Sequence, residues 1–441
     1  MSTGANIISP SDPGFAEAKF AYDLHDQKPA AICLPTTVAE VQQAVRWARD
    51  EGLKIANQAT GHVAVALPDL EDALLLKPQI DTEPVVDPAG GYCRVGAGTR
   101  WRQVVEAAAA HGMAAMHGSS PTVGVVGYHL GGGLSFYSRE HGLACNKVRA
   151  IEVVTADGEL ARIDRENEPD LFWALRGGGG LFATVTAIEF DLLPVGEVYG
   201  GASFWPVETA EAALSTWLDW TRTAPESVTS TFRIMNLPPF EVVPEPIRGK
   251  QLVVINGVAL DKGDGEALTA QLDGLGDPVM AQWGMMPGPA VASLHGDPED
   301  PVPAIGNSTM LDGVGDELVE AFIGAAGGES GCALIAAELR QLGGALRRPD
   351  PDGGVASMID GEFIAFGVGL APEPGMKAKT EGDLTRLMEA VKPWEGGRQY
   401  YNFAVGGAAC QDCFPEDDIE ALKAIRHEYD PESLYLAPLP L

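Results

Sequence analysis

The 441-residue sequence is poor in basic residues and contains no long apolar run. Its 30 Lys and Arg face 62 Asp and Glu, so the formal net charge is −32 at pH 7. This charge disfavours nucleic acids and anionic membranes as partners, because both are negative themselves. No apolar run approaches the ~20 residues of a transmembrane helix, and residues 1–10 lack the basic and apolar parts of a signal peptide. We therefore expect a cytoplasmic protein that binds neither nucleic acid nor membrane.

Cysteine is also scarce, with six in the whole chain. That number is too small for a disulfide scaffold in a chain of this length. Cys410 and Cys413 form an isolated Cys-x-x-Cys pair, which alone is weak evidence for a redox or metal site. His117, His141 and His295 have no partner at metal-ligand spacing, so we predict no metal site.

Glycine is concentrated in one stretch, residues 118–133, where it supplies six of sixteen positions. Glycine has no Cβ, so it permits positive φ and the close approach of another backbone or a ligand. Such a stretch is a poor helix and a poor strand. Val123, Val125 and Leu130 would anchor it in a core, which argues against a free loop. We expect a backbone cradle whose N–H groups hold an anionic or planar cofactor.

Two further stretches accompany the glycine-rich one. Residues 56–62 read Ala-Asn-Gln-Ala-Thr-Gly-His and follow an apolar strand over 53–56. A strand over 29–34 and a helix capped by Thr37 and Glu40 precede them, which predicts a β-α-β unit. Ligand loops emerge at the ends of such strands. Residues 173–180 form the third stretch, in which a helix-like segment ends in four glycines.

The remaining periodicity predicts two lobes with a boundary at 194–199. In the first lobe we expect strands at 73–76, 92–95 and 185–193, a helix at 100–111 and a hairpin over 151–163. A further helix is expected to be capped by Asn167, with Pro169 in its first turn. In the second lobe we expect helices at 209–220, 266–275 and 379–391, and strands at 251–260, 333–339 and 363–370. Residues 297–303 and 348–354 are expected to be surface loops, and residues 415–428 a final helix.

In their order, spacing and residues, the three stretches resemble the PCMH-type FAD-binding domain of the vanillyl-alcohol oxidase superfamily. Within that superfamily they resemble the berberine-bridge-enzyme-like oxidases. The resemblance covers residues 29–195 well, residues 394–441 fairly, and the segment between them weakly. It implies an α+β fold of two lobes, with a substrate domain of antiparallel sheet backed by helices. It also implies the domains 1–28 (N-terminal arm), 29–195 (FAD-binding), 196–393 (substrate) and 394–441 (returning to the FAD domain).

The same resemblance implies FAD held by one covalent bond, between His62 and the 8α methyl group. Ser120 stands where doubly linked relatives have cysteine, and a hydroxyl is too weakly acidic to replace the thiol. The resemblance therefore implies a single link. The residues implied to bind the cofactor are Gln58, Ala59, Thr60, Gly61, His62, Val63, Gly118, Ser119, Ser120, Val123, Gly124, Gly127, Val153 and Asn402.

Tyr400 and Asn402 match the family's Tyr-x-Asn motif, which implies that Tyr400 is the catalytic residue. A tyrosine of ordinary pKa, about 10, needs a cation or a dipole to act as a base near neutral pH. The candidates are Arg340, Arg398 and the flavin; alternatively Tyr400 belongs to an aromatic core strand. Glu338 and Arg340 alternate with apolar residues over a segment that predicts a strand. They are expected either to line the substrate pocket or to form a salt bridge at its rim.

Three features depart from the family pattern. Gln58 stands where many relatives have arginine, and Leu181 and Ala183 stand where many have Asn and Gly. The chain ends without the asparagine of the usual last strand, and Pro438 cannot donate a backbone N–H. The last of these departures alters the C-terminal wall of the site.

The expected function is that of an FAD-dependent oxidase, which takes a hydride from a small alcohol, amine or phenolic donor and passes the electrons to O2, giving H2O2. Two alternatives stay open from the same residues. One is an oxidative cyclase of secondary metabolism, and the other is a non-catalytic protein that binds flavin or another ligand. The sequence carries no signal for the substrate's identity or for the oligomeric state.

Overall fold

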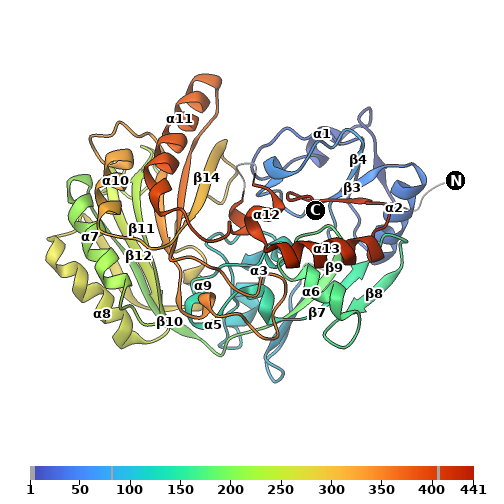
Figure 1. Ribbon diagram of the computed structural model, residues 1–441, viewed down its shortest axis with the longest axis horizontal. Helices are drawn as coiled ribbons and strands as arrows, with labels where there is room; N and C mark the ends of the chain where they lie inside the picture. Colours follow the sequence, from blue (N-terminus) through green and yellow to red (C-terminus); the bar gives the residue numbers. More distant parts are fainter. Residues whose placement is uncertain (1–4, 81–82, 405–407) are drawn as a thin grey trace.

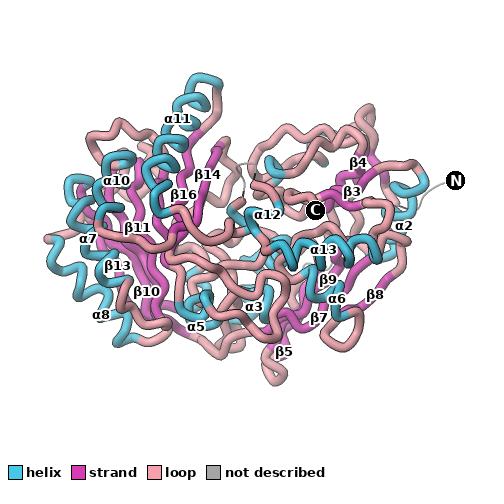
Figure 2. The backbone as a smooth tube through the Cα atoms, in the orientation of Figure 1, coloured by secondary structure: helices cyan, strands magenta, loops and turns pink. Residues whose placement is uncertain are grey.

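The computed structural model describes residues 5–80, 83–404 and 408–441, which form three sheets and their covering helices. The two smaller sheets lie at one end of the molecule and the largest at the other, with loops between them (Figure 1, Figure 2). We call them the N-terminal sheet, the middle sheet and the large sheet.

The N-terminal sheet has the strand order β1-β2-β4-β3-β17. Its strands are β1 (Ile7–Ile8), β2 (Ala31–Cys33), β3 (Lys54–Asn57), β4 (Ala73–Leu76) and β17 (Tyr435–Leu436). Helix α2 (Val38–Asp50) connects β2 to β3 and has the expected capping box between Thr37 and Glu40. Its apolar face is fully buried (Val41, Ala44, Val45 and Ala48). The β-α-β unit therefore ends β3 directly before the loop that carries His62.

The chain returns to this sheet at its C-terminus. Strand β17 pairs in parallel with β3, opposite Ile55 and Ala56. Tyr435 is fully buried, and its hydroxyl donates to the carbonyl of Val154 at 3.1 Å. The C-terminal segment thus completes the N-terminal sheet despite the altered final residues.

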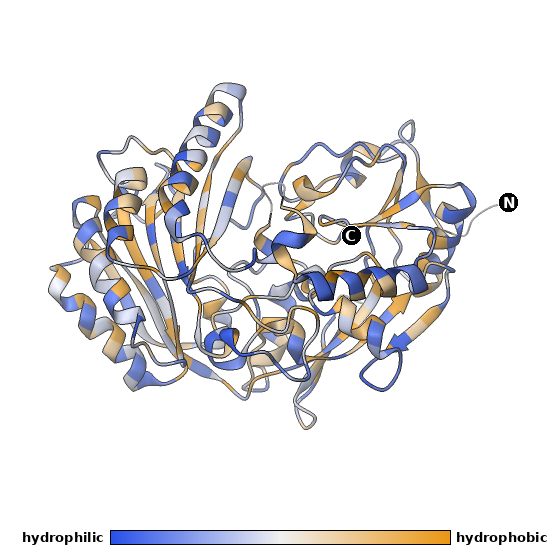
Figure 3. Cartoon of the chain, in the orientation of Figure 1, coloured by the Kyte–Doolittle hydropathy of each residue, from blue (hydrophilic) through white to orange (hydrophobic). Residues whose placement is uncertain are grey.

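The middle sheet has the order β5-β6-β9-β7-β8. Its strands are β5 (Val85–Asp87), β6 (Tyr92–Gly96), β7 (Val148–Val154), β8 (Leu160–Ile163) and β9 (Thr184–Asp191). Helices α3 (Trp101–Ala109), α6 (Pro169–Leu175) and α13 (Glu416–Tyr429) surround it. Most of α13 is hydrophilic (Figure 3), and only Leu422 and Ile425 on it are buried. Asn167 was expected to cap α6, but Glu168 is the capping residue and Pro169 is the first residue of the helix.

The large sheet is antiparallel, with the order β13-β10-β12-β11-β15-β16-β14. Its strands are β10 (Glu197–Pro206), β11 (Val228–Asn236), β12 (Gln251–Ala259), β13 (Met280–Pro287), β14 (Ala304–Leu311), β15 (Ala336–Gln341) and β16 (Phe363–Leu370). Helices α7 (Ala210–Thr221), α8 (Lys262–Leu272), α10 (Glu317–Ala326) and α11 (Pro374–Val391) cover one face (Figure 1). Sequence patterns predicted β12, β15 and β16 but missed the other four strands and α10. Residues 194–199 are only in part a boundary, because β10 already begins at Glu197.

Short helices complete the fold: α1 (Phe15–Ala18), α4 (Val125–Leu130), α5 (Ser138–His141), α9 (Gly288–Val291) and α12 (Cys410–Cys413). Single turns of 3-10 helix occur as η1 (Ala64–Ala66), η2 (Ala144–Lys147), η3 (Val207–Thr209), η4 (Asp273–Leu275), η5 (Gly344–Arg347), η6 (Lys392–Trp394) and η7 (Tyr401–Phe403). Two expectations are corrected here. The glycine-rich stretch contains the helix α4, and the aromatic run after Arg398 is the turn η7, not a strand.

Two general expectations can be compared with the described residues. Among them, no helix is both long and apolar enough to span a bilayer. All six cysteines are buried free thiols, including Cys410 and Cys413.

Candidate functional site

His62 lies in the loop between β3 and η1, in contact with three side chains. Its Nδ1 is 2.7 Å from Oγ1 of Thr60, and its Nε2 is 3.2 Å from Oγ1 of Thr122. Tyr22 stacks on the imidazole with a centroid distance of 3.8 Å and an interplanar angle of 11°. Burial, with a smaller contribution from Arg100, lowers the pKa of His62 from 6.5 to about 4. The ring is therefore neutral at pH 7 and keeps one nitrogen lone pair.

The loops around His62 present backbone donors that are not used by the protein. Among the described residues, the N–H groups of Thr60, Gly61 and His62 find no hydrogen-bond acceptor. The same is true of Gly118 and Ser119 in the glycine-rich stretch. All five residues are half-buried. Buried donors are normally paired, so two adjoining loops with free N–H groups are suited to an anionic ligand.

The glycine-rich stretch makes close contacts that only glycine allows. A Cβ on Gly131 would lie 1.8 Å from Oδ1 of Asn402, and one on Gly133 would lie 2.6 Å from the ring of Tyr128. Gly127, on α4, is different: it is exposed and has open space where its Cβ would be. The stretch therefore packs tightly against the C-terminal segment at Gly131 and Gly132 and is open at Gly127.

Tyr400 and Asn402, the two residues of the Tyr-x-Asn motif, lie against this stretch. Nδ2 of Asn402 donates to the carbonyl of Tyr128 at 2.9 Å and to the hydroxyl of Tyr400 at 3.2 Å. Burial raises the pKa of Tyr400 well above 10, despite the lowering effect of the Asn402 hydrogen bond. Arg398 is exposed, and Arg340 lies over the ring of Phe403 at 5.0 Å. Within the described structure, no arginine therefore pairs with the Tyr400 hydroxyl.

The large sheet contributes charged side chains from the face opposite its helices. Phe232, Ile234 and Leu339 point into the core under the helices. Successive side chains of a strand alternate between faces, so Arg233, Glu338 and Arg340 share the other face. Arg233 lies opposite Glu338 in the ladder between β11 and β15. The site-facing surface is thus polar although the strands themselves are buried.

These side chains form a buried cluster around His295, which lies in the loop after α9. Nε of Arg340 donates to Glu338 at 2.8 Å, and His295 Nε2 lies 3.2 Å from the other oxygen of Glu338. Arg233 donates to the carbonyl of His295 at 2.8 Å. Burial raises the pKa of Glu338, but Arg340 and His295 outweigh it, so the pKa is well below 4.5. Glu338 and Arg340 therefore form a buried ion pair and not a rim salt bridge, and Glu338 is only 1% exposed.

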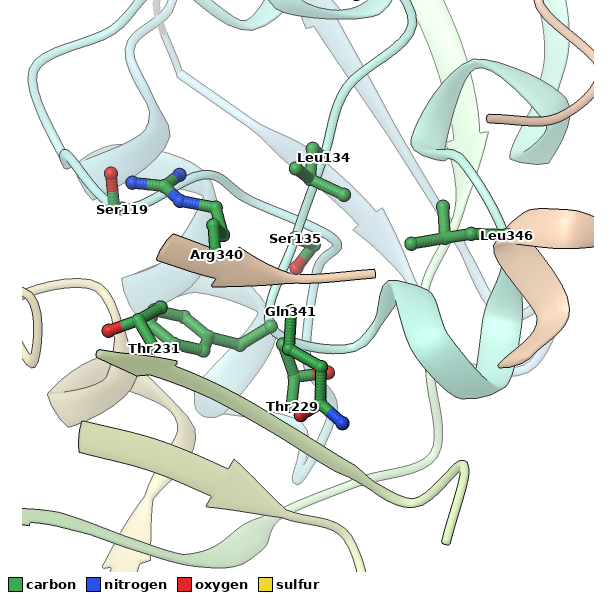
Figure 4. Close-up of a pocket in the computed structure, with 9 residues that line it drawn as sticks. Ser119, Leu134, Ser135, Thr229, Thr231, Arg340, Gln341 and Leu346 are labelled. Atoms are coloured by element: carbon green, nitrogen blue, oxygen red, sulfur yellow. The ribbon is translucent and has the colours of Figure 1, made fainter. Parts of the chain in front are cut away.

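A small cavity of about 20 Å³ lies between the glycine-rich stretch and the large sheet (Figure 4). Its walls include Ser119 from the glycine-rich stretch. The large sheet contributes Thr229, Thr231, Arg340 and Gln341. Figure 4 shows Ser119 and the Arg340 guanidinium on the same side of this space. Among the described residues, Thr229 Oγ1 and Gln341 Nε2 are buried without a hydrogen-bond partner. Unpaired groups in a cavity wall indicate a polar ligand, because burying them alone is costly.

The other residues predicted to bind the cofactor lie in or near these loops. Ser120 Oγ is 2.9 Å from Oγ1 of Thr122, which links it to His62 through one hydroxyl. Gln58 is buried, donates to the carbonyl of Phe20 at 3.3 Å, and has an unpartnered Oε1 among the described residues. Gly124 approaches Ala59, since its Cβ would lie 3.0 Å from that of Ala59. Val63 precedes η1. Val123 accepts a hydrogen bond from Trp101 N through its carbonyl.

Val153 occupies a more distant place. It lies inside β7, between β8 and β9, and its side chain is fully buried. Its suggested contact with the adenine end of the cofactor stays a prediction.

Sequence reasoning missed several residues of this site, chiefly Tyr22, Arg233, His295 and Asp297. Tyr22 belongs to the N-terminal arm, whose polar composition gives no site signal. The alternation of Thr229, Thr231 and Arg233 with apolar residues on β11 was a usable signal for a polar inner face. Asp297, expected in a surface loop, accepts a hydrogen bond from Ser119 at 2.7 Å.

Comparison with known protein families identifies the segment that carries His62 and the glycine-rich stretch. Residues 29–164 match the model of the FAD binding domain family. This part of the chain is an FAD-binding domain. The unused N–H groups beside His62 and the open space at Gly127 fit such a group, because both are suited to a pyrophosphate or a flat ring approaching the backbone.

Curated relatives match less than half of the sequence. The (R)-6-hydroxynicotine oxidase of Paenarthrobacter nicotinovorans is 31% identical over 215 residues, which are 48% of this chain and 47% of the relative. The glucooligosaccharide oxidase of Sarocladium strictum is 32% identical over 206 residues, 44% of this chain and 40% of the relative. The chain thus spans less than half the length of the curated relatives it matches.

Solved structures match over the whole length. Berberine-bridge-enzyme-like 1 of Physcomitrella patens superposes with a TM-score of 0.85 and 21% identity, over 100% of this chain and 97% of that one. The 6-hydroxy-D-nicotine oxidase of Arthrobacter nicotinovorans gives 0.82 at 24% identity, over 98% and 97%. The berberine bridge enzyme of Eschscholzia californica gives 0.81 at 18% identity, over 98% and 96%. The predicted α+β fold of the berberine-bridge-enzyme-like, vanillyl-alcohol-oxidase-type FAD proteins is confirmed.

Proposed function

We propose that this protein is an FAD-dependent oxidase acting on a small alcohol, amine or phenolic donor, with O2 as the acceptor. The proposal rests on the position of Ser119. This residue belongs both to the loop with unused backbone donors and to the wall of the cavity. A cofactor bound along that loop would therefore border a donor bound in the cavity. Bound FAD would supply the electron chemistry, by accepting a hydride from the donor carbon and returning both electrons to O2 as H2O2.

The cofactor would be held by the half-buried loops at 58–63 and 118–127, with one covalent bond at His62. The low pKa of His62 supports this bond, since a neutral imidazole has a nucleophilic nitrogen. Ser120 would not form a second bond, because its hydroxyl is a poor nucleophile without a nearby base. Its contact with Thr122 instead favours a role in the hydrogen-bond chain that reaches His62.

Tyr400 is proposed to take the hydroxyl or amine proton of the donor. In the described structure no cation faces its hydroxyl, and burial raises its pKa, so the phenol is protonated at rest. Its contact with Asn402 fixes the direction of the hydroxyl beside the glycine-rich stretch. A protonated phenol cannot accept a further proton, so Tyr400 would take the donor's proton in its phenolate form, after losing its own proton to solvent.

The cavity favours a neutral, hydrogen-bonding donor. Two arginines, Arg233 and Arg340, are matched by the carboxyl groups of Glu338 and Asp297, so the wall has no excess charge to pair with an ionic ligand. The unpaired Thr229 hydroxyl and Gln341 amide offer hydrogen bonds instead. A substrate with hydroxyl or amide groups fits this wall better than a carboxylate does.

Two measurements on the full chain test the proposal. The intact mass of the denatured protein reports covalent FAD, and a peroxide assay across neutral alcohols, amines, phenols and matched carboxylates reports turnover. We expect covalent FAD and peroxide from neutral donors. Covalent FAD without peroxide from any donor would favour the non-catalytic alternative, and a cyclised product would favour the cyclase. Faster turnover of carboxylates would contradict the assignment of the cavity.

A further inference from the structure

The N-terminal arm places an aromatic ring on the face of His62. The ring of Tyr22 stacks at 3.8 Å, nearly parallel to the imidazole. The arm reaches this place by pairing with the His62 loop itself: Tyr22 N donates to Thr60 O at 2.9 Å, and Asp23 N donates to Gly61 O at 3.1 Å. Oδ2 of Asp23 then accepts from the N–H of Val65 at 2.7 Å. Arm and loop are therefore one hydrogen-bonded unit on both sides of His62.

The far end of Tyr22 is held by the other lobe. Its hydroxyl donates to the carbonyl of Pro298, in the loop after α9. That loop is fixed to the first lobe at two points, Ser119 to Asp297 at 2.7 Å and Arg102 to Glu299 at 2.5 Å. Tyr22 is thus held at its backbone by the His62 loop, and its hydroxyl contacts the other lobe.

Three contacts together fix the His62 ring. Thr60 and Thr122 contact the two ring nitrogens, and Tyr22 covers one face of the ring. The threonine contacts alone would allow the imidazole to swing out of plane about the line between its nitrogens. A stacked ring removes that motion and excludes water from the covered face. A bond-forming nitrogen held within a narrow range of directions reacts faster, because less orientation is lost in the transition state.

We propose that Tyr22 is a positioning residue for the attachment of the flavin to His62. This inference rests on the covalent link of the proposed function. The bond joins a ring nitrogen of His62 to the 8α carbon of the flavin. The imidazole loses its N–H proton and the methyl carbon loses one hydrogen as a proton. The two electrons released pass through the isoalloxazine ring to O2, which takes up both protons and leaves as H2O2.

The experiment compares three full-length variants during incubation with FAD in air. Tyr22→Leu removes the stacked ring, Tyr22→Phe keeps the ring and removes the hydroxyl, and Tyr92→Leu alters a tyrosine that packs on Arg149 at the surface of the middle sheet. The rate at which intact mass increases by one FAD is measured for each variant, beside the dissociation constant for non-covalent FAD. Thermal unfolding is recorded for every sample.

We expect attachment at least tenfold slower in Tyr22→Leu, and within about threefold of the wild-type rate in Tyr22→Phe and Tyr92→Leu. The non-covalent dissociation constant of Tyr22→Leu should change far less than its attachment rate. A folded Tyr22→Leu protein that attaches FAD at the wild-type rate would overturn the proposal, as would an equal loss in Tyr22→Phe. If Tyr22→Leu fails to fold, the Tyr22→Trp variant replaces it, and the proposal then requires wild-type attachment, with slow attachment counting against it.

These outcomes are separate from those of the oxidase proposal. A wild-type protein that binds FAD, releases peroxide and gains no covalent mass would overturn the role of Tyr22 and leave the oxidase intact. A wild-type protein that attaches FAD with the expected dependence on Tyr22, but oxidises no donor, would support Tyr22 and contradict the oxidase.

Discussion

Residues 29–195 and residues 196–393 build their parts of the candidate site from different chemical groups. The first segment offers backbone N–H groups from two loops and close contacts at glycine, as at Gly131. The second offers charged and polar side chains from neighbouring strands, such as Arg233 on β11 and Glu338 on β15. Backbone donors suit a cofactor that is bound in the same way whatever the neighbouring side chains are. Side chains on strands suit a substrate whose identity depends on which residues stand there.

This difference explains why one part is recognisable and the other is not. A loop that presents backbone donors needs glycine and small residues at fixed spacing, so its sequence is constrained over a short stretch. A strand needs only alternation to present a side chain, and any of several residue types satisfies it. The match to the FAD binding domain accordingly stops at residue 164, while the fold matches over the whole chain.

The largest expected effect comes from Tyr400, which the C-terminal segment places between the two parts. Tyr400→Phe should lower turnover by about 100-fold or more, because a group that transfers a proton in the transition state is lost. Covalent FAD should be unchanged, since the loops that hold it are untouched. The matched control is Tyr128→Phe, whose hydroxyl is also buried but lacks a partner among the described residues. Single-turnover bleaching of the flavin absorbance measures both. Equal losses in the two variants would contradict a specific role for Tyr400.

The second test compares a buried ion pair on the large sheet with an exposed ion pair. Glu338→Ala should lower the free energy of unfolding by about 3–5 kcal/mol, because it leaves Arg340 buried without its partner. The control is Glu226→Ala, which removes an exposed pair with Arg348 and should cost about 1 kcal/mol or less. Urea unfolding monitored by tryptophan fluorescence measures both changes. Similar costs would show that the cluster is not a buried charge network.

Particular residues show how far the sequence could predict this structure. Thr37, Glu40 and the buried face of α2 carry local signals, and that helix appears as expected. Strand β13 has no fully buried residue, so it lacks an apolar pattern and was missed. His295 and Asp297 lie in a loop whose composition suggests only a surface turn. Their position depends on long-range contacts to β15 and Ser119, which no local pattern specifies.

Acid should destabilise the protein through its buried histidines, two of which lie in residues 29–195. Burial lowers the pKa of His117 and of His129 from 6.5 to about 4. The unfolded chain therefore binds protons below pH 6.5 that the folded chain binds only near pH 4. Their contribution to stability is complete above pH 6.5 and is lost as the pH falls towards 4, by about 3 kcal/mol for each histidine.

Unfolding midpoints at pH 7 and pH 5 check this expectation. Nδ1 of His129 donates to the carbonyl of Val125 at 2.9 Å, so His129→Gln can keep a polar contact but cannot titrate. We expect a smaller difference between the two midpoints in this variant than in the wild type. The exposed His111 serves as the control, and His111→Gln should leave the difference unchanged. An unchanged difference in His129→Gln would contradict a neutral buried imidazole.

The smallest expected effect comes from comparing a helical glycine beside the proposed cofactor site with a helical glycine far from it. Gly127 on α4 and Gly382 on α11 are both helical, exposed and free of neighbours where a Cβ would lie. Alanine at either place should raise the free energy of unfolding of the FAD-free protein by about 0.5–1 kcal/mol, through helix propensity. Only Gly127→Ala should also weaken non-covalent FAD binding, because its methyl group enters the space proposed for the cofactor. Fluorescence quenching titrations of free FAD distinguish the two; equal affinities would place the cofactor away from α4.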